Sequence, residues 1–271
     1  MTGRRPPYDL TTELADYPAR SGPPDRTVIL CSHPRSGSTL LGETIHAAGG
    51  LGCPLEYLHR GFRPSFATRW DAHDLAAFVE AMHRHRTDVS GVFSIKLFWR
   101  DVEEVTAEAG GPAAGDPAVG VDGMLDVLGP VLPNPTYVLL TRRDRVRQAV
   151  SAFMARETSS FRALPGAVPP PEREVVYDYQ AIRRQLAAAD ASNARWLGFF
   201  SAAGIEPYRV EYEELASDYE GTASAVLAHL GRPVMPSAPR LRRQSTAQSE
   251  EFVLRFLVDH QRSAELSTSL L

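Results

Sequence analysis

The first apolar run of the chain, residues 27–32, leads into the loop sequence His33-Pro34-Arg35-Ser36-Gly37-Ser38-Thr39. In a loop between a strand and a helix, backbone N–H groups and the positive end of the helix can point at one phosphate or sulfate group. Gly37 lets the backbone approach that anion, and the hydroxyls of Ser36, Ser38 and Thr39 add hydrogen-bond donors. The pattern predicts an anion-binding loop, and the alternative is an ordinary Ser/Gly/Pro turn after a strand.

The loop differs from a nucleotide triphosphate loop in one essential residue. Such loops need Gly, four residues and then Gly-Lys-Ser/Thr, in which the lysine reaches the β- and γ-phosphates and the hydroxyl binds magnesium. Here the lysine is missing and Arg35 stands inside the loop, where its planar guanidinium can donate two parallel hydrogen bonds to a tetrahedral oxyanion. The sequence therefore argues against a magnesium-dependent P-loop kinase or nucleotidase, which is kept as the alternative.

Two other basic segments could bind a second phosphate of the same ligand. Arg142 and Arg143 directly follow the third apolar run, and Ser151 lies about two helical turns further on. Either arginine could bind a phosphate together with the Ser151 hydroxyl, or the arginines could form a solvated basic helix face. Arg243 belongs to a basic, hydroxyl-rich turn that either completes the ligand site or caps the helix that follows.

Composition sets the domain organisation that has to position these residues. A chain of 271 residues with 43% hydrophobic content can form one large α/β domain. We expect a loosely held N-terminal arm over 1–25, which carries five prolines, and a single domain over 26–271. The net charge of −4 provides no broad basic field for nucleic acid or anionic lipid, so an anion site must be a local arginine cluster.

Cysteine usage and hydropathy indicate where the protein works. Cys31 and Cys53 cannot form a disulfide framework, and no Cys/His spacing matches a metal motif, so we expect no bound metal. The first residues contain no signal-peptide apolar run, and no stretch is long enough to span a bilayer. We therefore expect a cytoplasmic protein without a membrane span and without a nucleic-acid partner.

The hydrophobic pattern alternates between strands and helices, which favours right-handed βαβ crossovers and a mostly parallel sheet with ligands at its carboxyl edge. Strands are expected over 27–32, 92–99, 136–141 and 207–212. Helices are expected over 38–48, 72–86, 143–157, 178–203, 219–230 and 249–262. Loops are expected over 60–70, 108–121 and 158–171.

Five separated motifs, in order along the chain, resemble the trehalose sulfotransferase family of bacteria, whose members have a P-loop-like α/β fold. The motifs are His-Pro-Arg-Ser-Gly-Ser-Thr-Leu-Leu at 33–41, Gly-Cys-Pro-Leu-Glu-Tyr at 52–57, Lys-Leu-Phe-Trp at 96–99, Arg-Gln-Ala-Val-Ser at 147–151 and Arg-Gln-Ser-Thr-Ala-Gln-Ser-Glu-Glu-Phe at 243–252. The chain departs from the family pattern at Cys53 and at Ser245-Thr246, which bears on the acceptor. The sulfotransferase resemblance covers nearly the whole chain.

The resemblance implies a donor, a reaction and roles for particular residues. The donor is 3′-phosphoadenosine-5′-phosphosulfate (PAPS), and the product is 3′-phosphoadenosine 5′-phosphate (PAP). Loop 33–39 would bind the 5′-phosphosulfate, while Arg142 and Ser151 would bind the 3′-phosphate, with Arg143 as the rival for Arg142. Glu56 matches the carboxylate general base that accepts a proton from the acceptor hydroxyl. The resemblance also implies a homodimer.

Two other residues could take part in the reaction. Lys96 is the only lysine of the chain, and strand alternation places it opposite Phe93, Ile95 and Leu97. Its ammonium could stabilise the leaving phosphate, or it could reach to the surface. His59 is the rival of Glu56 as the base, because a neutral imidazole can accept a proton near pH 7.

The acceptor site is the least explicit in the sequence. Segments 57–70 and 153–164 mix aromatic and polar residues, which suits a sugar or a glycosylated or phenolic small molecule with a hydroxyl group. The acceptor-binding candidates are Tyr57, His59, Arg63, Phe153 and Arg156. A protein that binds PAPS without catalysis would need the arginines but no base, and is the second alternative.

Overall fold

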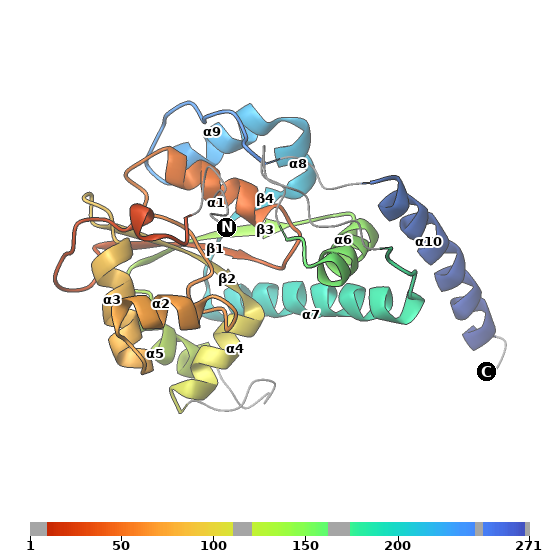
Figure 1. Cartoon of the computed structure of the whole chain (residues 1–271), viewed down its shortest axis with the longest axis horizontal. Helices are drawn as coiled ribbons and strands as arrows, with labels where there is room; N and C mark the ends of the chain where they lie inside the picture. The colour runs from red at the N-terminus through yellow and green to blue at the C-terminus, as the bar shows by residue number, and fades with distance from the viewer. Residues whose placement is uncertain (1–9, 111–120, 162–173, 242–245, 269–271) are drawn as a thin grey trace, which may run out of the picture.

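Four parallel strands form the sheet of the computed structural model, which describes residues 10–110, 121–161, 174–241 and 246–268 (Figure 1). Every pairing is parallel, and Leu30 lies opposite Lys96 on one side and Val138 on the other. The strands are β1 (Arg26–Ser32), β2 (Val92–Phe98), β3 (Pro135–Thr141) and β4 (Tyr208–Glu211), in the spatial order β2-β1-β3-β4. The predicted α/β fold with a mostly parallel sheet is confirmed.

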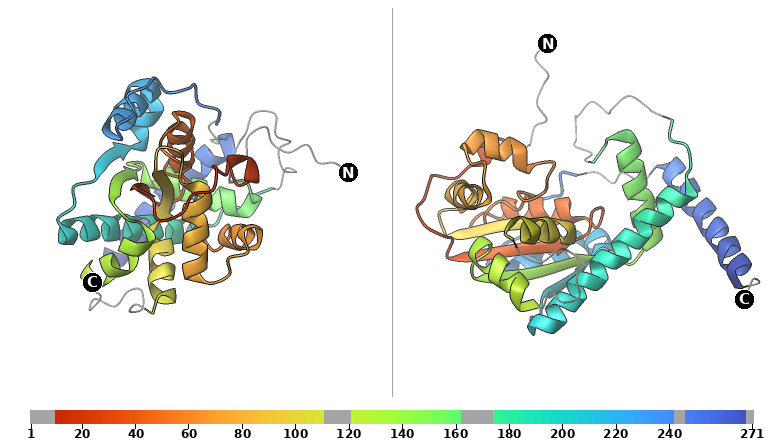
Figure 2. Two further views of the ribbon diagram at one scale, coloured as in Figure 1. Left: turned by 90° about the vertical axis from the view of Figure 1, so that its left-hand side faces the viewer. Right: turned by 90° about the horizontal axis from the view of Figure 1, so that it is seen from below.

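Helices flank this sheet on both faces (Figures 1 and 2). Within the described residues they are α1 (Ser38–Ala47), α2 (Arg63–Trp70), α3 (Leu75–Arg86), α4 (Trp99–Glu108), α5 (Val121–Val131), α6 (Arg145–Thr158), α7 (Tyr179–Ala203), α8 (Tyr212–Ser217), α9 (Tyr219–His229) and α10 (Ala247–Thr268). A short 3₁₀ helix, η1 (Glu13–Ala15), precedes the first strand.

Strand β1 lies at the centre of two apolar layers. Val28 and Leu30 belong to a buried cluster shared with α1 and α9, and Ile29 and Cys31 belong to a second cluster shared with α3, α4 and α7. Side chains alternate across a strand, so a strand that is covered on both faces reads as a continuous apolar run. This burial explains why the run before the anion-binding loop was visible in the sequence.

Four helices are not expected from the sequence. The prediction of a loop over 60–70 is wrong for α2, whose first turn accommodates Pro64. Helix α4 begins directly after β2, where Asp101 accepts a hydrogen bond from the Phe98 backbone N–H at 3.1 Å. Helices α5 and α8 fill stretches to which no element was assigned, and 111–120 of the predicted loop lies outside the described residues.

Helices α6, α7 and α10 pack around a third apolar cluster beside the sheet. Phe153 of α6 meets Phe252 of α10 with ring centroids 6.2 Å apart, and Ile182 of α7 is fully buried between them. The far end of α10 extends beyond the body of the molecule (Figures 1 and 2). Its outward side chains Leu254 and Val258 are 66% and 49% exposed, which leaves an apolar strip without cover from the described chain.

The segment before β1 is anchored from Leu10 onward. Leu10 is buried, and the Tyr17 backbone N–H donates to the His85 carbonyl at 2.9 Å. The Arg86 guanidinium donates to the Leu10 and Thr12 carbonyls. The sequence suggested a loosely held arm, whereas the structure attaches this part of it to α3. The division into an arm and one domain stays a prediction.

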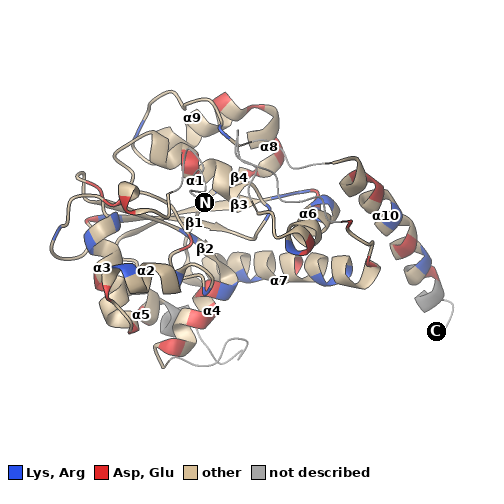
Figure 3. Cartoon of the chain, viewed as in Figure 1, with Lys and Arg blue, Asp and Glu red and all other residues tan. Residues whose placement is uncertain are grey.

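Charged residues of both signs are interspersed over most helices in the view of Figure 3. The net charge of −4 is therefore spread out, and the arginines discussed below act locally. In the part of the chain that the structure describes, no helix is long and apolar enough to cross a bilayer.

Candidate functional site

The loop between β1 and α1 is tightly turned at the carboxyl edge of the sheet. Arg35 and Gly37 both have positive φ, 67° and 89°, and the Ser36 hydroxyl donates to the His33 carbonyl at 2.8 Å. The Gln148 side-chain amide of α6 donates to the Pro34 carbonyl at 2.9 Å. These bonds hold the loop at the N-terminus of α1, where backbone N–H groups without helical partners can bind an anion.

Tyr212 fixes the same loop from the other side. A Cβ atom at Gly37 would lie 2.7 Å from Cδ2 of the Tyr212 ring, so only glycine fits there. The Arg142 guanidinium stacks on that ring at 4.5 Å from its centroid and donates to the Arg35 carbonyl at 3.2 Å. The ends of β1, β3 and β4 thus meet around the loop, at the edge where ligands of parallel sheets bind.

Arg35 connects the loop to helix α6. Its Nε donates to the Ser151 hydroxyl at 2.9 Å, and its Nη1 donates to the Phe161 carbonyl at 2.9 Å. The pKa of Arg35 is lowered, first by burial and then by the charge of Arg142. Two cations this close repel each other, and an anion bound between them would relieve that repulsion.

The neighbouring arginines Arg142 and Arg143 have different environments. The Arg142 side chain points toward the loop, and its Nε is buried without a hydrogen-bond partner among the described residues. The Arg143 side chain is exposed, and its Nε forms an ion pair with Glu211 at 2.8 Å. Arg142 thus has a buried donor available for a ligand, whereas Arg143 is already neutralised by a carboxylate.

Lys96 joins the predicted base to the anion-binding loop. Its Nζ lies 2.6 Å from Oε1 of Glu56 and donates to the Thr39 hydroxyl at 3.1 Å. The Lys96 side chain is 2% exposed, so the alternative in which it reaches to the surface is wrong. Glu56 itself keeps 16% of its side chain accessible, as a group that meets a substrate must.

The turn that carries Glu56 is held by the sheet. Leu55 forms a parallel bridge with Ile95, and the Lys96 backbone N–H donates to the Leu55 carbonyl at 2.9 Å. This short extension beside β2 places Glu56 next to the Lys96 side chain. Gly42 of α1 allows the turn to come close, because a Cβ there would lie 3.3 Å from the Pro54 carbonyl oxygen.

The pKa values of two histidines near the site are lowered, which favours their neutral forms. Burial, followed by the charges of Arg100 and Arg145, lowers the pKa of His33 to about 4. Burial also lowers the pKa of His59, against the raising effect of the Glu56 charge. The Nδ1 of His59 accepts a hydrogen bond from the Gly61 backbone N–H at 3.0 Å. That ring nitrogen is therefore engaged with the backbone, which favours Glu56 over His59 as the base.

Asp101 is a buried carboxyl that the sequence analysis did not single out. It is fully buried, and its Oδ1 has no hydrogen-bond partner among the described residues. Burial raises the pKa of Asp101 to about 7; the hydrogen bond from Phe98 opposes this, and the charge of Glu56 adds to it. The negative charge of Glu56 is therefore close enough to disfavour a second charge on Asp101.

We expect Asp101→Asn to change how stability depends on pH. The folded-state pKa of about 7 exceeds that of an unfolded carboxyl, so between about pH 4 and pH 7 the folded protein binds more protons and its stability falls as pH rises. The amide keeps the acceptor for Phe98 but cannot ionise, so at pH 8 the variant should be more stable than the wild type by up to about 4 kcal/mol. Urea unfolding at pH 4, 6 and 8 measures this; an equal difference at all three values would contradict it.

Three predicted acceptor-binding residues lie in other surroundings. Tyr57 is fully buried, and its hydroxyl donates to the Cys53 carbonyl at 2.6 Å. Phe153 is buried in the cluster of α6 and α10. Arg63 forms a two-pronged ion pair with Glu108 and lies over the Phe78 ring. Packing takes Tyr57 and Phe153 out of reach of an acceptor, and Arg63 is held by the surface of α4.

The remaining predicted residues are placed as follows. Ser38 and Thr39 begin α1 at the anion-binding loop, and Ser151 lies one hydrogen bond from Arg35. Arg156 is exposed near the end of α6. Arg243 lies outside the described residues. Of the candidates, the structure brings together the loop 33–39, Glu56, Lys96, Arg142 and Ser151.

Tyr212 and Gln148 belong to this site although the sequence analysis missed them. Tyr212 directly follows β4 at the ligand-binding edge, and that position was a signal which could have identified it. Gln148 stands in the motif Arg-Gln-Ala-Val-Ser at 147–151, but nothing local indicated its role, because its bond to the Pro34 carbonyl joins residues 114 apart in the chain. Among the described residues, no three His, Cys, Asp or Glu side chains gather as metal ligands.

Solved structures that match this chain include a sulfotransferase from Alicyclobacillus acidocaldarius, at 13% identity and TM-score 0.48, covering 91% of this chain and 96% of that one. The sulfotransferase domain of the Synechococcus PCC 7002 olefin synthase matches at 16% identity and TM-score 0.34, covering 80% and 78%.

Sequence comparisons match most of this chain to known sulfotransferases. Two curated relatives are trehalose 2-sulfotransferases: one from Mycobacterium tuberculosis at 28% identity, covering 85% of this chain and 94% of the relative, and one from Mycolicibacterium smegmatis at 27%, covering 88% and 97%. The family model described as Stf0 sulphotransferase matches residues 27–259, which include every element from β1 to most of α10. The chain therefore belongs to the Stf0 sulphotransferase family.

Proposed function

We propose that the protein transfers a sulfuryl group from PAPS to a hydroxyl of a small carbohydrate acceptor, with Glu56 as the general base. The observation that carries this proposal is the chain of contacts from Glu56 through Lys96 to Thr39. These contacts hold the Glu56 carboxylate and the Lys96 ammonium beside the loop that we expect to bind the sulfuryl group of the donor. A base and an anion site held together in this way are what transfer to a hydroxyl requires.

The residues at the sheet edge fit a donor with phosphates at both ends. Loop 33–39 would receive the 5′-phosphosulfate on its amides and hydroxyls. Arg142 has a buried Nε with no hydrogen-bond partner in the described chain, and it would bind the 3′-phosphate with the Ser151 hydroxyl. AMP offers only one of these phosphates, so we expect tighter binding of PAP than of AMP or ATP.

The reaction then needs one proton transfer and one displacement. The acceptor oxygen attacks sulfur as its proton passes to the Glu56 carboxylate, and the bond between sulfur and the bridging oxygen of the donor breaks in line. PAP leaves with the electron pair of that bond. In this proposal the Lys96 ammonium, which lies beside Glu56 and Thr39, would stabilise the bridging oxygen, and Arg35 and the loop amides would stabilise the other oxygens.

A sugar acceptor is favoured by the two trehalose 2-sulfotransferase relatives. The departure from the family pattern at Cys53 does not alter an acceptor surface, because this side chain is fully buried beside Arg86. The other departure from the family pattern is Ser245-Thr246, of which Ser245 lies outside the described residues. We include trehalose among the acceptors and expect a hydroxyl, not an amine, to be sulfated.

The test is incubation with labelled PAPS and a panel of trehalose, other sugars, glycosides and phenols. Mass spectrometry should show the gain of one sulfuryl group on a sugar, and calorimetry should show tighter binding of PAP than of AMP. Parallel reactions with ATP and magnesium provide the control. Transfer of a phosphoryl group from ATP would support the kinase alternative instead. Tight PAP binding without turnover of any acceptor would support the alternative of a PAPS-binding protein without catalysis.

Assembly and location also belong to this proposal. A homodimer is supported by the family resemblance and by the exposed apolar strip on α10, where Leu254, Leu257 and Val258 are 66%, 49% and 49% exposed. Light scattering that shows only a 29.7 kDa monomer at micromolar concentration would contradict the homodimer. A cytoplasmic location and the absence of a nucleic-acid partner stay predictions.

A further inference from the structure

Two junctions between a strand and a helix lie side by side next to the anion-binding loop. The first junction comprises residues 142–144, between β3 and α6, and the second comprises residues 211–213, at the end of β4 and the start of α8. Strands β3 and β4 are parallel, with Thr141 opposite Glu211, so both junctions lie at the carboxyl edge of the sheet. This is the edge where Arg142 would bind the 3′-phosphate of the donor.

Glu213 of the second junction binds the backbone of the first with both oxygens of its carboxylate. Its Oε2 accepts a hydrogen bond from the Arg143 backbone N–H at 3.0 Å, and its Oε1 accepts one from the Asp144 backbone N–H at 3.1 Å. Burial opposes ionisation, but these two bonds, the Glu213 backbone N–H and the charge of Arg142 together lower the pKa of Glu213. The first junction is therefore held by an ionised carboxylate, whose hydrogen bonds are stronger than those of a neutral acceptor.

Arg142 directly precedes the two backbone N–H groups that Glu213 binds. Its guanidinium stacks on the ring of Tyr212, the neighbour of Glu213, at 4.5 Å from the ring centroid, and donates to the Arg35 carbonyl at 3.2 Å. Two adjacent residues of the second junction thus hold the backbone after Arg142 and the Arg142 side chain. An arginine that is fixed before the ligand arrives loses less conformational entropy on binding.

The same contacts decide which groups remain for a phosphate at the end of β3. Backbone N–H groups at the start of a helix attract anions, and α6 begins at Arg145. Here the Asp144 N–H is bound by Glu213, and the Asp144 side chain accepts the Arg147 N–H at 2.9 Å. Carboxylates of the protein occupy these donors. The buried Nε of Arg142, by contrast, has no hydrogen-bond partner in the described chain.

We infer that Glu213 is a positioning residue of the donor site, whose carboxylate fixes the first junction so that Arg142 meets the 3′-phosphate. This inference rests on the proposed function, because it concerns the site for PAPS. A carboxylate repels a phosphate, so Glu213 acts through Arg142 and not by contact with the nucleotide. Recognition of the 3′-phosphate should depend on Glu213, whereas binding of the 5′-phosphate to the loop 33–39 should not.

The test compares Glu213→Gln with Glu214→Gln. Both substitutions remove one negative charge from α8, and Glu214 is exposed. Glutamine has one acceptor oxygen instead of two, so one backbone N–H of the first junction loses its partner. Glu213→Gln should weaken PAP binding by about tenfold, the size of one lost hydrogen bond to a charged group, while AMP binding changes by less than about twofold. Glu214→Gln should weaken neither. Calorimetry with both nucleotides measures this.

The sign of the effect separates positioning from simple electrostatics. Loss of a negative charge near an anion site would by itself strengthen PAP binding, so a weaker binding cannot come from the charge alone. In the double variant Glu213→Gln with Arg142→Ala, PAP binding should be no weaker than in Arg142→Ala, because both changes act on one contact. If Glu213→Gln does not fold, Glu213→Asp, which keeps the charge on a shorter side chain, should show the same selective loss of PAP binding.

Three results would overturn the inference. Unchanged or tighter PAP binding in Glu213→Gln, with a wild type that prefers PAP to AMP, would reject it and leave the proposed donor in place. Equal losses of PAP and AMP binding, or additive losses in the double variant, would give Glu213 a general structural role instead. A wild type that binds PAP no more tightly than AMP would reject the proposed donor and this inference together.

Discussion

Replacing Glu56 by glutamine is expected to lower turnover by about 10²–10⁴-fold while affinity for PAP stays within about twofold. Glutamine has nearly the same shape as glutamate but cannot accept the proton of the attacking hydroxyl. The proposed donor contacts are those of the loop 33–39, Arg142 and Ser151, and the substitution changes none of these residues. Single-turnover kinetics with PAPS and the preferred sugar, together with PAP calorimetry, measure the two quantities separately.

The neighbouring Lys96 makes a stability control necessary. Lys96 is 2% exposed and loses its carboxylate partner in the variant, which leaves a buried charge without full compensation. The Tm should therefore fall, and turnover must be compared well below it. The double variant Glu56→Gln with Lys96→Met removes the unpaired charge; it should recover stability without recovering turnover.

His59→Ala is the matched control for the identity of the base. The His59 ring has one nitrogen engaged with the Gly61 backbone N–H, and its loss should lower turnover by less than tenfold, the size of one lost contact. If His59→Ala proved more damaging than Glu56→Gln, the two residues would have to exchange roles.

The parts of the fold that were predicted correctly are those whose local pattern reports burial. The run 27–32 is apolar at every position because β1 is covered on both faces, and the helix after the loop shows its spacing through Leu41 and Ile45. Helix α4 was missed because Trp99 reads as the continuation of a strand. The structure ends the strand at Phe98, where Asp101 accepts the backbone N–H.

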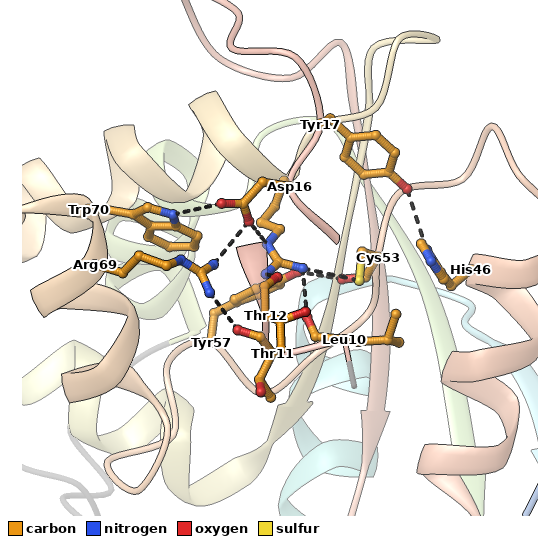
Figure 4. A network of polar contacts seen from close by, with 11 residues as sticks. Leu10, Thr11, Thr12, Asp16, Tyr17, His46, Cys53, Tyr57, Arg69 and Trp70 are labelled. Atoms are coloured by element: carbon orange, nitrogen blue, oxygen red, sulfur yellow. Dashed lines mark hydrogen bonds and ion pairs between the residues drawn. The ribbon is translucent and has the colours of Figure 1, made fainter. Parts of the chain in front are cut away.

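The parts of the fold and of the site that were not predicted depend on contacts between residues far apart in the sequence. Strand alternation gave the direction of Lys96, but its burial depends on Glu56 and Thr39, which are 40 and 57 residues away. The anchoring of segment 10–17 depends on Arg69 and Arg86, which donate hydrogen bonds to its backbone carbonyls (Figure 4). In the sequence, Arg69 reads as an ordinary charged residue of a loop and Arg86 as one of a helix. No pattern within the segment itself could show that two arginines would bind its carbonyls.

The choice between Arg142 and Arg143 was equally beyond the sequence, and it leads to a discriminating pair of variants. Both residues follow β3, but Arg143 forms an ion pair with Glu211 of β4 while Arg142 stacks on Tyr212 and faces the loop. The two arginines differ because the folded sheet brings the Glu211 carboxylate next to Arg143 and not next to Arg142. Arg142→Ala and Arg143→Ala therefore test the assignment of the 3′-phosphate with equal changes in charge.

Arg142→Ala is expected to weaken PAP binding by on the order of 10–100-fold, because a hydrogen bond to a charged group contributes about 1.5–3 kcal/mol. Arg143→Ala should change it by less than about threefold, since it removes an exposed ion pair. AMP, which lacks the 3′-phosphate, provides the second control: its affinity should be nearly the same in both variants and the wild type. Calorimetry with the two nucleotides measures all six values. An equal loss of PAP and AMP binding in Arg142→Ala would show that this arginine supports the loop through the Arg35 carbonyl and would withdraw it from the 3′-phosphate site.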